Sequence, residues 1–193
     1  MPAATRDRIV DATASLLQRQ GFTGTGVKQI VSEAGAPFAS LYHFFPGGKE
    51  ELGVEAIRVA GARYGDLIPL FYESEKDPVK ATRAFFDAAA ATMRDSGYED
   101  ACPIATVALE VSSTSEAMRV ACADVFESWL ATIVGHLRRA GVSPKRARDT
   151  ALVLFSLLEG AFIHARATRS TDALHAAGRT AAETVRGALP SRR

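Results

Sequence analysis

Residues 38–45 carry the side chains whose types and spacing best suit recognition of another molecule. At helical spacing, three of them face inward (Leu41, Phe44 and Phe45), and four are left near the outer surface: Phe38, Ser40, Tyr42 and His43. Another short helical segment precedes them, and two short helices joined by a glycine-containing turn form a helix-turn-helix. The second helix of that motif enters the major groove of DNA. The prime base-reading positions are therefore Phe38, Ala39 and Ser40.

Residue groupings that would support catalysis or metal binding are not indicated. The Gly24-Thr25-Gly26 turn has no strand before it, so it is not a dinucleotide-binding fingerprint. No Ser-His-Asp or Cys-His grouping is suggested by spacing. Cys102 and Cys122 are too few for a disulfide scaffold and have no neighbouring cysteine or histidine at metal-site spacing. We therefore expect a protein that is not an enzyme and that uses no metal and no cofactor.

The whole-chain composition is that of an ordinary folded protein. Of 193 residues, 47% are hydrophobic and 23% are charged, and the net charge is +1, so any case for DNA binding must be local. The N-terminus has no apolar signal-peptide core. The most apolar stretch, 151–163, is interrupted by Ser156 and Glu159 and is shorter than the roughly 20 residues that span a bilayer. We expect a cytoplasmic protein with no membrane partner.

Helical periodicity recurs along the chain and strand signals are nearly absent, which predicts an all-α fold of about nine helices. The first three helices are expected at about 6–20, 26–34 and 38–45, and the later ones are mostly longer. This change of scale indicates an N-terminal helix-turn-helix DNA-binding domain over 1–50 and a C-terminal helical ligand-binding and dimerisation domain over 51–193. No loop signal interrupts 50–68, so one helix beginning near Lys49 is expected to couple the two domains.

Local charge around the predicted helix-turn-helix is modest. Five basic and three acidic residues leave a net charge of +2 through Lys49, and Glu50 and Glu51 then cancel it. Because phosphate contacts dominate non-specific affinity for DNA, we expect that affinity to be weak and sensitive to salt. Within the motif, Thr25 is placed to cap the second helix, and Gly35 is placed to end it.

Residues 5–52, TRDRIVDATASLLQRQGFTGTGVKQIVSEAGAPFASLYHFFPGGKEEL, resemble the DNA-binding domain of the TetR family over nearly every position of its signature. The matching positions include Gly21-Phe22, Ala34-Gly35 and Leu41-Tyr42. The resemblance implies a homodimer that binds a double-stranded DNA operator. It also implies phosphate or base contacts from residues that fit the family's pattern. Together with the neighbouring outward residues, the expected DNA-binding set is Thr25, Lys28, Pro37, Phe38, Ala39, Ser40, Tyr42, His43 and Lys49.

The reading segment departs from the family at three neighbouring positions. The family usually has Ser, Lys and Gly where this sequence has Pro37, Phe38 and Ala39, so an aromatic ring replaces a basic contact. The Phe38 ring would either touch a thymine methyl group, which apolar side chains can read in the major groove, or simply be half-buried packing. Both interpretations stay open on the sequence alone.

Two further segments, 46–52 and 101–105, resemble the multidrug-efflux repressor (LmrA/YxaF-like) branch of the family. This branch implies a small-molecule effector that is drug-like or aromatic. Apolar helical faces that converge can enclose a pocket, although aromatic and methionine stripes more often only pack in a core. The expected pocket comprises Phe85, Phe86, Met93, Cys102, Met118, Cys122, Phe126, Trp129, Phe155 and Glu159.

The last two helices are expected to form the homodimer interface. The helix near 144–166 is apolar on more sides than a monomer core needs, and the helix near 171–189 carries small alanines that let helices approach closely. Glu159 would be hydrogen-bonded across the dimer, line the pocket or face solvent. Together with the resemblance, these features predict a ligand-responsive transcriptional repressor that binds a palindromic operator as a dimer. The alternative is a helical ligand-binding or partner-binding dimer without sequence-specific DNA recognition.

Overall fold

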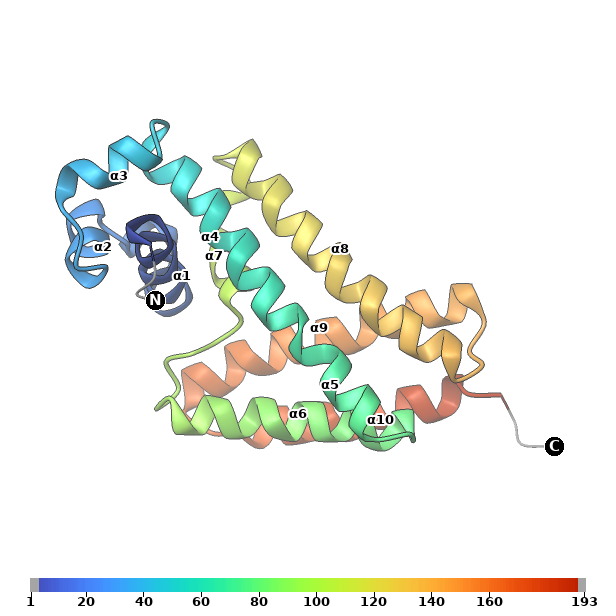
Figure 1. Ribbon diagram of the computed structural model, residues 1–193. Helices are drawn as coiled ribbons and strands as arrows, with labels where there is room; N and C mark the ends of the chain where they lie inside the picture. Colours follow the sequence, from blue (N-terminus) through green and yellow to red (C-terminus); the bar gives the residue numbers. More distant parts are fainter. Residues whose placement is uncertain (1–3, 191–193) are drawn as a thin grey trace. The chain divides into compact units, whose positions relative to one another are not determined.

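The computed structural model describes residues 4–190, in which all regular secondary structure is helical (Figure 1). The predicted all-α class is therefore confirmed. Ten α-helices occur in this range rather than about nine, because the helix that begins beside Lys49 is broken at Asp66. The helices are α1 (Thr5–Gly24), α2 (Val27–Glu33), α3 (Phe38–Phe44), α4 (Gly48–Gly65), α5 (Leu67–Ser74), α6 (Pro78–Asp95), α7 (Pro103–Val111), α8 (Glu116–Arg139), α9 (Pro144–Thr168) and α10 (Asp172–Ala188).

The chain divides into two compact units. Unit 1 comprises Met1–Arg63 and Cys102–Phe126, and unit 2 comprises Tyr64–Ala101 and Glu127–Arg193. Each unit is therefore assembled from two separate stretches of sequence. The predicted domains, 1–50 for DNA binding and 51–193 for ligand binding and dimerisation, are defined by function and not by compact packing. They stay a prediction.

Unit 1 contains the three N-terminal helices, which pack against one another, and α7, which packs against α1. Its core consists of large apolar side chains at helical spacing, as expected for amphipathic helices that share one buried face. Those almost completely buried include Ile9, Ile30, Leu41, Phe45 and Leu52. α2 and α3 are therefore held together as the two short helices of the predicted helix-turn-helix.

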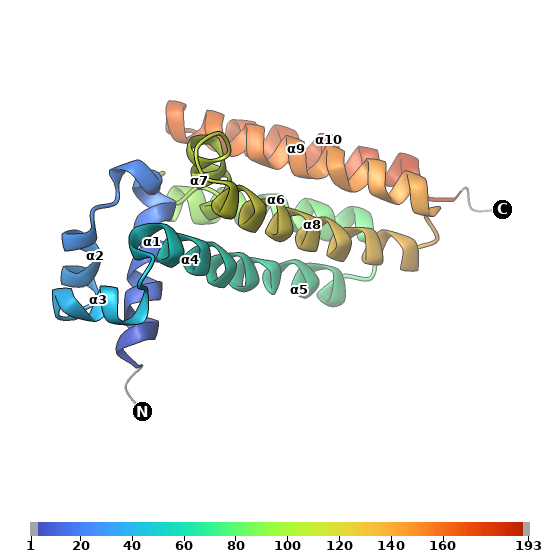
Figure 2. The same ribbon diagram turned by 90° about the horizontal axis from the view of Figure 1, so that it is seen from above.

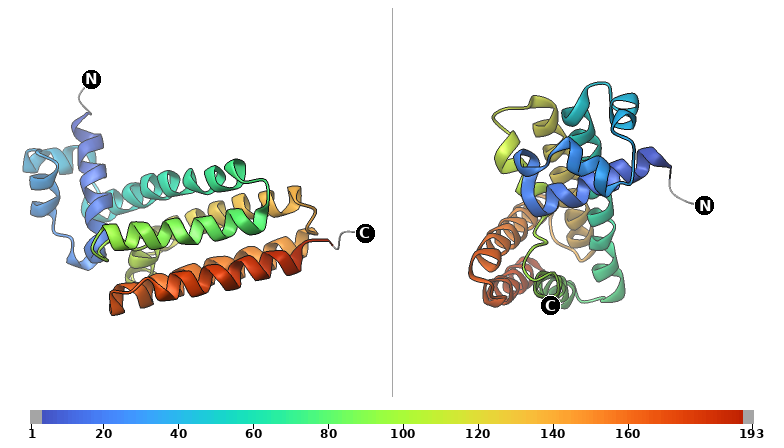
Figure 3. Two further views of the ribbon diagram at one scale, coloured as in Figure 1. Left: turned by 90° about the horizontal axis from the view of Figure 1, so that it is seen from below. Right: turned by 90° about the vertical axis from the view of Figure 1, so that its left-hand side faces the viewer.

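Unit 2 packs α6, α9 and α10 side by side (Figures 2 and 3). Phe86 and Met93 of α6 and Leu174 of α10 are almost completely buried in this unit. The α6 and α10 helices approach so closely that a Cβ added at Gly178 would lie 2.8 Å from the Cβ of Phe86. Small residues of α10 thus serve packing within one subunit, because they let the two backbones come together.

Helices α6 and α7 each begin with a side-chain cap. The Asp77 carboxylate accepts a hydrogen bond from the Val79 amide at 2.9 Å, and the Cys102 sulfur accepts one from the Ala105 amide at 3.4 Å. A proline follows each cap as the first helical residue, where its missing N–H costs nothing. The sequence pairs Asp77-Pro78 and Cys102-Pro103 thus mark the starts of α6 and α7.

Helices α8 and α9 are long and apolar enough to cross a bilayer, judged by length and composition. Both also contribute to the protein core, through Leu137 of α8 and Leu154 of α9. Core helices of soluble proteins pass the same criterion, so the finding is weak evidence for a membrane. Helix α9 nevertheless leaves three large apolar side chains exposed, namely Leu152, Val153 and Ile163.

Candidate nucleic-acid interface

The helix-turn-helix is supported by residues that α2 and α3 contribute to the core of unit 1. Ile30 of α2 and Leu41 of α3 are completely buried, and Phe45 directly after α3 is 2% exposed. The guanidinium carbon of Arg6 lies 5.2 Å from the centroid of the Phe45 ring, and Arg6 also pairs with Glu55 of α4 at 2.8 Å. The hydrogen bond with Glu55 raises the pKa of Arg6. These contacts fix which face of α3 is turned outward.

The outward face of α3 presents the residues predicted to read bases. Pro37, Phe38 and Ala39 are exposed, and Ser40 is half-buried. The side chains of Phe38 and Tyr42 are each 48% exposed, and their ring centroids lie 5.7 Å apart with a tilt of 55°. Part of the Phe38 surface is thus covered by another outward residue, and the ring keeps an exposed apolar surface.

The end of α3 differs from the prediction at one position. Periodicity predicts an inward Phe44, whereas Phe44 is 36% exposed. The chain leaves the helix after Phe44, and the Phe45 amide closes the last turn on the Leu41 carbonyl at 2.8 Å, so Phe45 alone turns into the core. His43 is exposed, with its ring 4.9 Å from that of Phe44 in an edge-on arrangement.

Thr25 lies beneath the surface rather than on it. Its side chain is completely buried, and its hydroxyl donates a hydrogen bond to the Gly21 carbonyl at 2.6 Å. The residue that precedes α2 is Gly26, and no side chain caps that helix, so the predicted Thr25 cap is wrong. Thr25 therefore holds the turn between α1 and α2, and its contact with DNA stays a prediction, while Lys28 of the expected set is exposed on α2.

Lys49 stands in the first turn of α4 and is half-buried. Its ammonium donates a hydrogen bond to the Phe22 carbonyl at 2.5 Å and lies 4.2 Å from the centroid of the Phe22 ring. Burial lowers the pKa of Lys49, against an opposing effect of the Glu110 carboxylate. In this conformation the ammonium therefore binds the end of α1, and its contact with a phosphate stays a prediction.

Glu110 of α7 is a residue of this region that the sequence reasoning missed. Its carboxylate accepts a hydrogen bond from the Thr23 amide at 2.8 Å and lies against Gly21, where an added Cβ would overlap it. Gly21 interrupts α1 with a φ of 72°, in the region that favours glycine. Thr23 and Glu110 are 87 positions apart, so no local pattern could connect them. Gly21, which marks the end of the predicted first helix, is the one feature of the sequence that points to this part of the contact.

Other basic side chains near the helix-turn-helix are also engaged within unit 1. The Arg8 guanidinium donates to the Ala34 carbonyl at 3.0 Å, and Arg63 pairs with Asp11. An open cavity of about 460 Å³ lies beside this region. It is lined by Arg6, Phe44, Phe45, Gly47, Glu50, Glu51, Val54, Glu55, Arg58 and Ala117, none of which belongs to the predicted pocket.

The predicted pocket residues are distributed over both units. Unit 1 contains Cys102, Met118, Cys122 and Phe126, and unit 2 contains Phe85, Phe86, Met93, Trp129, Phe155 and Glu159. Most are buried, whereas Phe85, Phe126, Phe155 and Glu159 are half-buried. Within unit 2, ring centroids lie 6.2 Å apart for Phe85 and Phe86 and 6.5 Å apart for Trp129 and Phe155. Core residues have the same contacts, so the pocket stays a prediction.

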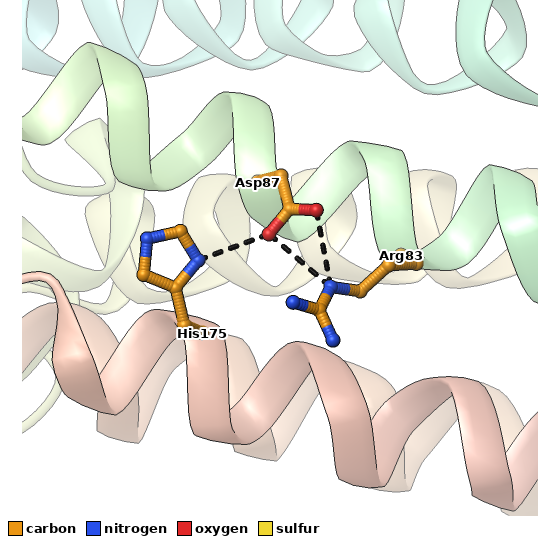
Figure 4. A network of polar contacts seen from close by, with 3 residues as sticks. All are labelled: Arg83, Asp87 and His175. Carbon is orange, nitrogen blue, oxygen red and sulfur yellow. Dashed lines mark hydrogen bonds and ion pairs between the residues drawn. The ribbon is translucent and has the colours of Figure 1, made fainter.

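A polar network joins α6 to α10 in unit 2 (Figure 4). The Asp87 carboxylate accepts hydrogen bonds from His175 Nδ1 and from Arg83 Nε, each at 3.0 Å. Partial burial raises the pKa of Asp87, but the hydrogen bonds from His175 and Arg83 lower it by more. The network stabilises the packing of the two helices. Residues 4–190 contain no group of three or more metal-ligating side chains placed to hold an ion.

Comparison with known protein families gives two matches along the chain. Residues 9–56 match the family described as bacterial regulatory proteins, tetR family. Residues 78–180 match the family described as transcriptional regulator LmrA/YxaF-like, C-terminal domain. The first match covers the helix-turn-helix, and the second covers more than half of the chain.

Similar individual proteins are found both by sequence and by structure. The HTH-type transcriptional regulator LmrA of Bacillus subtilis is 34% identical over 89% of this chain and 92% of its own length. YxaF, an HTH-type transcriptional regulator of the same organism, is 36% identical over 81% of this chain and 82% of its own length. The crystal structure of a TetR transcriptional regulator from Legionella pneumophila superposes with a TM-score of 0.84 at 22% identity, covering 95% of this chain and 99% of that one.

Proposed function

Because this chain belongs to the TetR family of bacterial regulatory proteins and carries its LmrA/YxaF-like C-terminal domain, we propose that it represses transcription as a ligand-responsive homodimer. The dimer binds a palindromic operator and releases it when a small aromatic or drug-like molecule binds. The matched families and relatives are transcriptional regulators and not enzymes. Their work is done on DNA, which supports a cytoplasmic location and argues against a membrane partner.

One observation carries the proposal for DNA. The α2 and α3 helices bury Ile30 and Leu41 in unit 1 while the outward face of α3 stays exposed at Phe38, Tyr42 and His43. A short helix held in this way can enter the major groove, and two copies read successive grooves when they lie about 34–36 Å apart. Ligand binding acts by favouring a conformation with a different spacing, since a ligand shifts an equilibrium only through unequal affinity for its states.

Selection of bound sequences from random duplex DNA by the purified protein tests the proposal. We expect enrichment of a palindrome with half-sites about one helical turn apart, first at low salt and then near physiological salt. Tyr42→Ala should weaken binding of the enriched duplex by about tenfold or more and leave the dimer intact. Full-strength binding by both Tyr42→Ala and Lys49→Ala would contradict the assignment of the reading face.

A second candidate function is favoured by the apolar character of that face. The exposed rings of Phe38 and Tyr42 could also contact a protein, which would make the chain a ligand-binding or partner-binding dimer without sequence-specific DNA recognition. Failure to enrich any sequence at either salt concentration would support this candidate.

The exposed apolar residues of α9 support the homodimer. Leu152, Val153 and Ile163 are 40%, 43% and 62% exposed, and Ser156 and Gly160 between them are small and exposed as well. A second copy of the helix could approach closely along this face, and a closed dimer buries the same patch on both subunits. The buried face of α10 is already used within one subunit, so α9 supplies most of the apolar contact in the proposed interface.

The ligand pocket is proposed within the C-terminal domain, among the predicted residues of unit 2. Trp129 and Phe155 form a ring pair, and the ring centroids of Phe85 and Phe71 lie 5.3 Å apart in an edge-on arrangement. Aromatic lining of this kind suits an aromatic ligand, because ring pairs favour edge-on or offset contacts.

A further inference from the structure

The beginning of α3 presents an apolar surface to its surroundings. Pro37, Phe38 and Ala39 are exposed, and none of the three side chains has a hydrogen-bonding group. Phe38 remains 48% exposed although the core beneath it is complete, with Leu41 at 0% and Phe45 at 2% exposure. The side chains of this surface can therefore contribute apolar contact only.

The bases offer an apolar group of this kind in one place only. In the major groove, guanine, adenine and cytosine present hydrogen-bond donors and acceptors, whereas thymine adds the C5 methyl group. Pressing an apolar side chain onto a polar base edge would leave that edge without a partner. On the premise of the proposed operator binding, we infer that Phe38 contacts a thymine methyl group, so that each half-site of the operator carries a T·A base pair facing this residue.

The neighbouring ring of Tyr42 prepares Phe38 for this contact. The two residues are one helical turn apart on the same side of α3, and their ring centroids are separated by 5.7 Å. Contact with Tyr42 restricts the side chain of Phe38 before DNA arrives, so less rotamer freedom is lost on binding. The Phe38 ring then selects thymine, and the Tyr42 hydroxyl is available for a phosphate oxygen.

Replacing thymine by uracil in the selected operator tests the contact with the unaltered protein. Uracil pairs like thymine and lacks only the methyl group. We expect one T·A pair per half-site at which this replacement weakens binding about three- to fivefold, and about tenfold or more when both half-sites are changed. Placing C·G at that pair should also weaken binding, and 5-methylcytosine should recover part of the loss because it presents a methyl group at the same position.

Two variants assign the methyl contact to one residue. Phe38→Ala should bind the thymine and uracil duplexes with equal affinity, because the group that senses the methyl is gone. Phe44→Ala is the matched control, since Phe44 is an exposed aromatic residue of the same helix on another side. It should keep the full preference for thymine.

The possible outcomes separate this inference from the proposed function. Unchanged affinity for uracil at every base pair of an enriched operator would overturn the methyl contact and leave operator binding standing. A thymine preference that survives in Phe38→Ala would likewise overturn the assignment to Phe38. If selection enriches no sequence, both the operator and the methyl contact fail.

Discussion

The Glu110 carboxylate of α7 lies against the backbone of Gly21, where α1 is interrupted. One of its oxygens accepts the Thr23 amide hydrogen, so the acidic side chain also holds the residues that lead into the helix-turn-helix. Gly21 adopts a φ of 72° and leaves the space that the carboxylate occupies. The end of α1 can therefore pack against α7 because Gly21 has no side chain and the Glu110 carboxylate fills the space beside it.

Gly21→Ala should lower the free energy of unfolding by about 1–3 kcal/mol, because alanine at positive φ is strained and its Cβ displaces Glu110. Urea denaturation measures the change. Gly24→Ala is the control, since a Cβ there would lie at an ordinary 3.5 Å from the Gln20 Cβ. In a Glu110→Ala background the cost of Gly21→Ala should shrink, and an equal cost in both backgrounds would contradict the contact.

Lys49→Ala and Tyr42→Ala should differ in their effect on stability. Loss of the Lys49 ammonium leaves the Phe22 carbonyl and ring without their contact, which should cost about 1–2 kcal/mol of unfolding free energy. Tyr42 is exposed on α3, so its removal should change that free energy by less than about 0.5 kcal/mol. Denaturation of the two variants side by side measures the difference, and equal stabilities would argue against the Lys49 contact.

The Asp87 network should give a small dependence of stability on acid. The folded pKa of Asp87 lies below its ordinary value, so the ionised carboxylate favours the folded state. That stabilisation is complete above about pH 5 and is lost as the pH falls through and below about 4. Since 43% of the carboxylate side chain is exposed, its contribution is at most about 1 kcal/mol.

Acid denaturation of Asp87→Asn should show less loss of stability over that acid range than the unaltered protein does. Asp149→Asn is the matched control, because it removes a pair with Lys145 in which both side chains are largely exposed. If the two variants respond alike to acid, the network does not contribute as described.

Cys122 should be unreactive while the protein is folded. Burial raises the pKa of its thiol to about 11, and only 2% of the residue is exposed. At pH 8 the thiolate fraction is then about a hundredfold below that of an ordinary cysteine, and the thiolate is the form that reacts. Alkylation with iodoacetamide, followed by mass spectrometry of the peptide, should show slow labelling in buffer and fast labelling in denaturant. Comparable labelling rates in buffer and in denaturant would show that the Cys122 thiol is not shielded in the folded protein.

Ile163→Arg should disrupt the proposed homodimer. The side chain is 62% exposed on α9, and a charge placed on both copies of a shared apolar face would be buried without a partner. We expect the dimer dissociation constant to rise by about tenfold or more in sedimentation velocity, with the helical circular dichroism unchanged. Leu70→Arg on α5, which changes a residue of 57% exposure, should leave the dimer intact. A dimer that tolerates Ile163→Arg would place the interface elsewhere.

Local patterns predicted the elements around the candidate site well, since α1, α2 and α3 lie close to the expected ranges. Periodicity alone placed Phe44 inward, because it treats the helix as continuing through Phe45, whereas the chain leaves the helix between the two. The cap assigned to Thr25 failed for a similar reason, as its hydroxyl bonds backward to Gly21 and not forward into α2. The break at Asp66 lacks a strong local signal, and the Glu110 contact depends on residues far apart in sequence.

Unit 1 is assembled from two stretches, one ending at Arg63 and the other running from Cys102 to Phe126. A chimera that joins the N-terminal stretch of unit 1 to another C-terminal domain by a single junction after α4 would lack the second stretch. Glu110 would then be missing from the end of α1. Unit 1 therefore cannot be transferred to another protein as one continuous segment. Its exchange by recombination requires two crossovers, or a recipient whose α7 already packs against α1.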